Sequence, residues 1–96
     1  MAVEHIVLIE KKDDATDEQI QALIEGLKGV KGVIPGVEDV KINENFTDRA
    51  PYSHGAIITL SDRDALAGYG PHQAHQDVLE LLKPVAENLV IVDIES

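Results

Sequence analysis

The stretch YSHGAIITLSDRDALAGYGPHQAHQDVLELL, residues 52–82, joins a strand pattern to a helix pattern that is interrupted once. Residues 52–60 alternate between two faces, which is typical of a β-strand. Residues 61–64 have the pattern of a capping box, which predicts a short helix that ends near Tyr69. Gly70-Pro71 breaks this helix, and because proline suits the first turn of a helix, it also begins a second one. The stretch therefore predicts a strand followed by a helix in two pieces.

Strand and helix patterns also alternate on both sides of this stretch. The expected strands are residues 3–9, 37–42, 52–60 and 89–94, and the expected helices are residues 16–30, 61–69 and 71–84. The first helix starts with a capping box and repeats apolar residues at helical spacing. The order β-α-β-β-α-β is that of an α+β, ferredoxin-like antiparallel sheet with its helices on one face.

Length and composition define a single domain. The chain has 96 residues, of which 44% are hydrophobic and 27% are charged, so residues 1–96 form one globular unit. Its net charge of −10 repels phosphate backbones and anionic membrane surfaces, which argues against a nucleic-acid or membrane partner. The chain has no cysteine, no secretory signal pattern and no apolar run of membrane-spanning length, so we expect a cytoplasmic protein.

One face of the predicted sheet has no cover within a single chain. If the helices cover one face, the other presents Ile6, Leu8, Ile57 and two apolar residues of the last strand. Monomers rarely leave a contiguous apolar patch of this kind in water. We therefore expect a homodimer in which two sheets pack face to face through these surfaces.

Polar rings on otherwise apolar faces are the candidates for a functional site. The first and third strands are neighbours in this topology, so His5 and His54 are expected to point into one space. His75 begins an apolar helix stripe, and Tyr69 ends the preceding helix. The expected pocket lies between the sheet and the helices. Its apolar wall is expected to contain Leu23, Leu27, Ile58, Leu79 and Leu82.

These rings permit two interpretations. A neutral imidazole can remove a proton, and a tyrosine hydroxyl can hold the developing oxyanion or orient the base, so the site could drive enolisation, aldol cyclisation or a lyase step without a metal or cofactor. Alternatively, the histidines are core residues that bond to the backbone and fill space. His72 and His75 lie three apart on one helix, but without a third ligand we expect no metal site.

The chain resembles the stress-responsive A/B barrel family, also called the dimeric α/β barrel (Dabb) domain, along nearly its whole length. The residues that carry the resemblance are Val3-Glu4-His5-Ile6-Val7-Leu8, Ile34-Pro35-Gly36-Val37, Tyr52-Ser53-His54, Tyr69 through His75, and Val92-Asp93. The resemblance implies a ferredoxin-like subunit that pairs into a dimeric barrel.

Within this family the chain is similar to cofactor-free polyketide cyclases of plants. That similarity implies His75 as the catalytic base and Tyr69 as the residue that assists it, with His5 and His54 as substrate-binding histidines. Leu27 stands where the cyclase pocket has a tyrosine, and Gln73 stands where a proline is common.

Three functions stay open from the sequence. The first is a homodimer that binds a small organic molecule in an apolar pocket. The second is a cofactor-free cyclase, aldolase or lyase that acts on a polyketide-like carbonyl compound. The third is a purely structural, stress-stable assembling protein.

Overall fold

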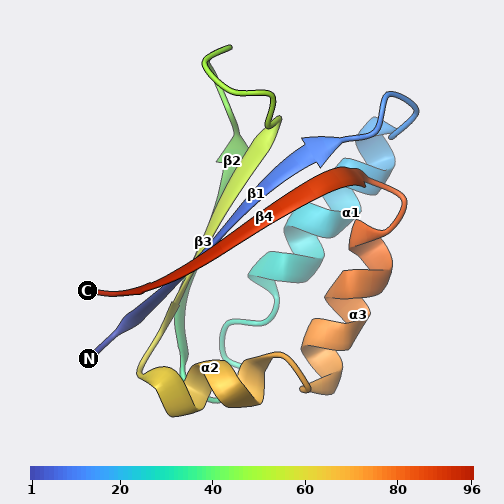
Figure 1. The fold of residues 1–96 in the computed structure, drawn as a ribbon. Coiled ribbons are helices and arrows are strands. Elements are labelled where there is room, and N and C mark those ends of the chain that lie inside the picture. The colour runs from blue at the N-terminus through green and yellow to red at the C-terminus, as the bar shows by residue number, and fades with distance from the viewer.

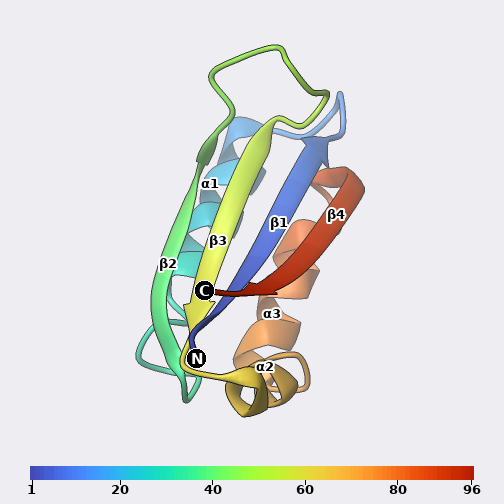
Figure 2. The same ribbon diagram turned by 60° about the vertical axis from the view of Figure 1, so that its left-hand side comes forward.

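The computed structural model describes residues 1–96 and has the element order predicted from the sequence. The elements are β1 (Val3–Lys11), α1 (Asp17–Lys28), β2 (Val37–Glu44), β3 (His54–Leu60), α2 (Arg63–Tyr69), α3 (Gln73–Leu82) and β4 (Ala86–Glu95). The four strands form one antiparallel sheet in the order β2-β3-β1-β4 (Figure 2). The helices lie on one side of this sheet (Figure 1). The ferredoxin-like α+β fold is confirmed, with β1 as a central strand.

The capping box predicted for the first helix is present. The Oγ1 atom of Thr16 accepts from the backbone N–H of Gln19 at 3.1 Å, and the Gln19 side chain accepts from the backbone N–H of Thr16 at 2.9 Å. Two otherwise unpaired donors are thereby satisfied, which stabilises such a helix start by about 1 kcal/mol. Further along α1, Leu23 and Leu27 are buried against the sheet side.

The start of α2 differs from the sequence prediction. Asp62 rather than Ser61 is the N-cap residue, and its carboxylate accepts from the backbone N–H of Ala65 at 2.8 Å. The predicted capping box over residues 61–64 is therefore absent. The reason is that a carboxylate is a stronger acceptor than a hydroxyl and also interacts favourably with the positive end of the helix dipole.

The start of α3 also differs from the prediction, because Pro71 lies before the helix rather than in its first turn. His72 is the N-cap, and its Nδ1 atom accepts from the backbone N–H of Ala74 at 3.0 Å. The helix proper begins at Gln73. The imidazole thus takes the capping role that Ser, Thr, Asp or Asn fills in most helices.

The strand ends are shifted by a few residues from the expected bounds. β3 begins at His54 and not at Tyr52, because the Asn45 side chain donates to the carbonyl of Tyr52 at 2.9 Å and holds that residue in the loop. The loop between β2 and β3 therefore comprises residues 45–53 instead of 43–51. β4 is longer than expected because the strand pairs with β1 over almost its full length.

The core lies between the sheet and the helices. It contains Val3, Ile9, Leu23, Leu27, Val30, Ile34, Val37, Ile42, Ala56, Ile58, Leu60, Tyr69, Val78 and Val85. Two glycines permit close packing around it. A Cβ atom on Gly26 would lie 2.5 Å from Cδ1 of Leu81, and one on Gly36, whose φ is +87°, would lie 2.4 Å from Cβ of Ala65. The absence of a side chain at Gly26 allows α1 to approach α3 closely. The absence of one at Gly36 allows the turn before β2 to approach α2.

The opposite face of the sheet, which we call the open face, carries no helix (Figure 2). Strand register places Ile57, Ile6 and Val92 in one row across β3, β1 and β4, and Gly55, Leu8 and Val90 in the next row. Ile57 is 38% exposed and Val92 is 46% exposed. The apolar patch expected from the sequence is therefore present in the isolated chain. No helix is long and apolar enough to cross a membrane.

Candidate functional site

Three of the four predicted rings meet beneath the helices. His5 comes from β1, Tyr69 from the last position of α2, and His75 from the first turn of α3. The ring centroids of His5 and Tyr69 are 5.5 Å apart in an edge-on arrangement, and those of Tyr69 and His75 are 4.5 Å apart. The break at Gly70-Pro71 brings the end of one helix and the start of the next to the same ring cluster.

The His75 ring is held in one tautomer. Its Nδ1 atom lies 2.9 Å from the carbonyl oxygen of Gly70, at the break between α2 and α3. A carbonyl oxygen only accepts, so Nδ1 must donate its proton to it. In the neutral ring the Nε2 atom therefore carries a free lone pair, which is the state that a general base or a hydrogen-bond acceptor needs.

Asp93 orients the His5 ring. The two residues are cross-strand partners of β1 and β4, and the Nδ1 atom of His5 lies 2.5 Å from Oδ1 of Asp93. The His5 side chain is 11% exposed and that of Asp93 is 40% exposed, so the carboxylate connects a buried ring with the surface. Sequence reasoning missed Asp93 as a site residue. The sequence feature that could have identified it is that Asp93 is the single charged residue in the apolar run from Leu89 to Ile94.

Tyr69 is a buried hydrogen-bond donor. Only 2% of the residue is exposed. Burial raises the pKa of its phenol to about 12, because the charged phenolate is disfavoured away from water. The hydroxyl therefore stays protonated at neutral pH and can donate to a carbonyl or to an oxyanion beside His75.

The three rings border a small apolar cavity between the sheet and the helices. Twelve of its 14 lining residues are hydrophobic, and its volume is about 60 Å³. The wall residues predicted from the sequence all line it, namely Leu23, Leu27, Ile58, Leu79 and Leu82. Sites for drug-sized ligands span roughly 300–1,000 Å³. In this state the cavity accommodates a group of a few heavy atoms, and a larger ligand requires lining side chains to move.

The most exposed residues that line this cavity belong to β4. Leu89 and Ile91 line the cavity and are 38% and 50% exposed. The buried liners Leu23, Leu27 and Ile58 are at most 6% exposed. The exposed residues of the cavity lining are therefore on the outer strand, whereas those from α1 and β3 are buried.

The structure places His54 apart from the other rings. His54 pairs with Ile9, whereas His5 pairs with Ile58, so the two histidines share a face of the sheet but lie four residues apart along β1. This separation is about 13 Å in a strand. His54 does not line the cavity, and the expectation that it shares one space with His5 is not met.

His54 has only one ring nitrogen with a partner. Its Nδ1 atom lies 2.9 Å from Oγ of Ser53, and its Nε2 atom is buried without a partner. The Ser53 hydroxyl already donates to the carbonyl of Ile9, so it accepts from Nδ1 and the free lone pair is on Nε2. Burial lowers the pKa of His54, and the positive charge of Lys11 lowers it further, against the opposing effect of Glu44.

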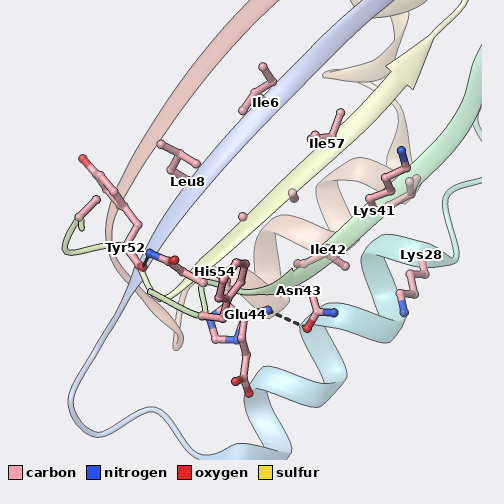
Figure 3. A pocket seen from close by; sticks show the side chains of 16 residues that line it. Ile6, Leu8, Lys28, Lys41, Ile42, Asn43, Glu44, Tyr52, His54 and Ile57 are labelled. Atoms are coloured by element: carbon pink, nitrogen blue, oxygen red, sulfur yellow. Dashed lines mark hydrogen bonds between the residues drawn. The ribbon is translucent and has the colours of Figure 1, made fainter. Parts of the chain in front are cut away.

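A second hollow lies on the open face, away from the ring cluster. This groove has a volume of about 800 Å³ and runs between the sheet and the loop at residues 45–53. Figure 3 shows Ile6, Leu8 and Ile57 side by side on the strands that form its floor, with Tyr52 at one end. Its apolar floor is the patch for which the sequence predicts a partner chain.

His72 and His75 each use one ring nitrogen for a contact within the chain. The Nδ1 atom of His72 caps α3 and that of His75 donates to Gly70. No group of three or more His, Cys, Asp or Glu side chains lies close enough together to hold an ion.

Comparison with known proteins gives a family and a fold. The model of the stress responsive A/B barrel domain matches residues 3–96. Olivetolic acid cyclase of Cannabis sativa is 25% identical in an alignment that covers 97% of this chain and 95% of the cyclase. A dimeric ferredoxin-like protein of unknown function from Thermobifida fusca superposes with a TM-score of 0.87 at 23% identity, covering 100% of this chain and 92% of that one. A hydroxynitrile lyase from Passiflora edulis has a TM-score of 0.87 at 18% identity, covering 97% and 91% of the two chains.

Proposed function

The chain belongs to the stress-responsive A/B barrel domain family, and from this premise we propose that it is a homodimer that binds a small organic molecule between its sheet and its helices. One observation carries the proposal: the polar rings of His5, Tyr69 and His75 meet at the wall of a cavity that is otherwise apolar. A few convergent polar groups in an apolar cavity are the usual composition of a small-molecule site.

The polar groups favour a ligand with a carbonyl or hydroxyl group. The Tyr69 hydroxyl is a donor whose raised pKa keeps it protonated, and Nε2 of His75 is an acceptor because its other nitrogen donates to Gly70. A ligand hydroxyl group can accept from Tyr69 and donate to His75, whereas a ligand carbonyl oxygen can only accept from Tyr69. The hydrophobic remainder of the cavity favours an apolar body for the same ligand.

Proton transfer on such a ligand is a second candidate function. In this reaction Nε2 of His75 removes a proton from the carbon next to a carbonyl group, and Tyr69 donates a hydrogen bond to the enolate oxygen that forms. The enolate carbon then attacks a second carbonyl of the same molecule, and the imidazolium returns its proton to the new alkoxide. The fixed tautomer of His75 and the sequence similarity to olivetolic acid cyclase support this candidate.

The homodimer is proposed through the open face of the sheet. Ile6, Leu8 and Ile57 form the centre of this face together with the outward row of β4. Polar residues such as Glu4 and Lys41 border it, which is the arrangement of an apolar interface centre with a polar rim. Two structures that share the fold, from Thermobifida fusca and a Jannaschia species, are dimeric ferredoxin-like proteins, which supports this proposal.

Mass spectrometry of the native protein, followed by NMR titration, tests the ligand proposal. We expect a small carbonyl or hydroxyl compound to copurify and to shift the ring signals of Tyr69 and His75 when it is added back. Replacement of His75 by Ala should abolish this binding and any turnover of a β-diketone panel. If no compound from such a panel perturbs these rings, the histidines have a structural role and the proposal fails.

A further inference from the structure

The carbonyl oxygen of Gly70, at the break between α2 and α3, accepts two side-chain hydrogen bonds from α3. Nδ1 of His75 lies 2.9 Å from this oxygen, and Nε2 of Gln76 lies 2.8 Å from it. A carbonyl oxygen has two lone pairs and only accepts, so both nitrogens donate to it and its capacity is filled. The direction of this carbonyl is therefore set by two consecutive residues of α3, of which only His75 belongs to the ring cluster.

The Gln76 side chain bonds to a residue outside its own helix. Glutamine in a helix ordinarily pairs with residues three or four positions away, as Gln73 does when its amide donates to Asp77 at 2.8 Å. The acceptor at this spacing from Gln76 is Glu80, whose carboxylate instead binds Lys83 at 2.8 Å. Helix side chains lean toward the N-terminus, so Gln76, near the start of α3, can reach back to the break. Its hydrogen bond therefore joins α3 to the segment that precedes it.

Water competes for the Gly70 carbonyl. Gly70 is only partly buried and Gln76 is exposed, so their hydrogen bond lies near the surface of the molecule. A carbonyl at a helix end that lacks a protein donor turns toward water to satisfy its lone pairs. The Gln76 amide takes the place of such a water molecule and keeps the oxygen within reach of His75.

The Gly70 carbonyl also selects the tautomer of His75. Either nitrogen of a neutral imidazole can carry the proton, and the nitrogen that faces an acceptor keeps it. Tyr69 is next to Gly70 in the chain, and its ring centroid is 4.5 Å from that of His75, so a movement of Gly70 affects both rings. The position of this one carbonyl thus determines which nitrogen of His75 has a free lone pair.

We propose that Gln76 is a positioning residue for His75: its amide holds the Gly70 carbonyl against Nδ1, and this keeps the free lone pair on Nε2. Gln76 does not line the cavity, so it acts through the carbonyl and not by contact with a ligand. The use of that lone pair by a ligand rests on the proposed function. The effect of Gln76 on the His75 tautomer requires no ligand.

Two-bond ¹H–¹⁵N NMR of the Gln76→Met variant tests the proposal on the whole chain. Methionine is close to glutamine in length, suits a helix and cannot donate a hydrogen bond to a carbonyl. We expect the ratio of the Nδ1–H form to the Nε2–H form of His75 to fall about threefold to tenfold at about pH 8.5, where histidine side chains are ordinarily neutral. His5 is an internal reference in the same spectrum, because Asp93 holds its tautomer.

Gln73→Met is the matched control. Gln73 and Gln76 are both exposed on α3, and the amide of each donates a hydrogen bond within the chain. The control loses its bond to Asp77 and should keep the wild-type ratio at His75. Gln76→Lys restores a donor at the same position, since an ammonium group only donates, and should recover most of the lost Nδ1–H form.

Three results would overturn the positioning role. A ratio in Gln76→Met that is unchanged or higher would leave Gln76 a structural contact. An equal loss in Gln73→Met, or a loss that persists in Gln76→Lys, would assign the effect to α3 as a whole. Failure of the proposed function is a separate result: acetylacetone and other β-diketones would then leave the Tyr69 and His75 signals of the wild type unchanged, while the tautomer ratios stay measurable.

Discussion

His5 and Asp93 face each other across β1 and β4, with Nδ1 of the imidazole 2.5 Å from Oδ1 of the carboxylate. This pair links the ring cluster beneath the helices to the surface, because the histidine is buried and Asp93 is partly exposed. A carboxylate on Nδ1 holds the proton on that nitrogen and leaves Nε2 as the acceptor. The same state is imposed on His75 by the carbonyl of Gly70. Two imidazoles with the same tautomer therefore flank the Tyr69 ring.

Replacement of Asp93 by Ala should release the His5 tautomer. Without its acceptor, Nδ1 loses the interaction that holds its proton, and we expect a substantial population with the proton on Nε2. Two-bond ¹H–¹⁵N NMR spectra distinguish the two forms directly. Asp39→Ala is the control, because its carboxylate pairs with Lys31 on the surface and should not affect His5. A His5 tautomer that is unchanged in Asp93→Ala would contradict the orienting role.

Replacement of His75 by Ala and of Leu60 by Ala should separate function from packing. Leu60 is 0% exposed in the core and does not line the cavity, so its truncation should cost about 2–5 kcal/mol of unfolding free energy and leave the ligand site in place. His75 is only partly buried, so its replacement should cost less stability, but it should abolish ligand binding. Urea unfolding and ligand titration on both variants measure the two effects. A stability loss for His75→Ala as large as that for Leu60→Ala would indicate a packing role.

Stability should fall in mild acid because of His54. Burial lowers the pKa of its native ring below the ordinary value of 6.5, so the unfolded chain binds more protons over this range. The unfolding free energy should therefore be constant above about pH 7.5 and decrease as the pH falls through about 6.5. Urea titrations between pH 5 and 8 measure this slope.

The His54→Leu variant should flatten that pH dependence, since leucine cannot take up a proton. His72→Asn is the matched control, because asparagine retains the helix-capping function of His72 and the buried histidine remains in place. If the unfolding free energy of His54→Leu depends on pH as steeply as that of the wild type, another group causes the acid sensitivity.

Tyr69 should resist ionisation up to high pH. Burial raises its pKa to about 12, whereas an unfolded tyrosine ionises near about 10. Between these values the native state binds more protons than the unfolded state, so stability should decrease as the pH rises. Absorbance at about 295 nm in a Tyr52→Phe variant isolates the Tyr69 signal. Complete ionisation of Tyr69 near pH 10 in folded protein would contradict its burial.

A charge at the centre of the open face should disrupt the dimer. Ile57→Asp places a carboxylate in the row that contains Ile6 and Val92, where a partner sheet would remove it from water. We expect unfolded or aggregated protein, measured by sedimentation and circular dichroism. Val33→Asp, at an exposed position outside this face, should leave the assembly unchanged. A soluble, folded Ile57→Asp dimer would rule out the open face as the interface.

The sequence by itself determined the order of elements and the faces of the sheet. Helical and strand periodicities are local properties, and the capping box at Thr16 and Gln19 is formed by residues three apart. The alternation in residues 3–9 and 54–60 also separates a helix-facing set from the set that contains Ile6 and Ile57. These features led from the printed residues to the α+β fold and to the apolar wall of the cavity without any knowledge of distant contacts.

Only the tertiary structure decided which side chains meet. Strand register places Asp93 opposite His5 and places His54 four residues away from it along β1, although all three share one face. Register depends on pairing between segments that are distant in the chain, and local patterns do not specify it. The cavity volume and the groove beneath the loop at residues 45–53 depend on how neighbouring side chains fill space, which is a property of packing in three dimensions.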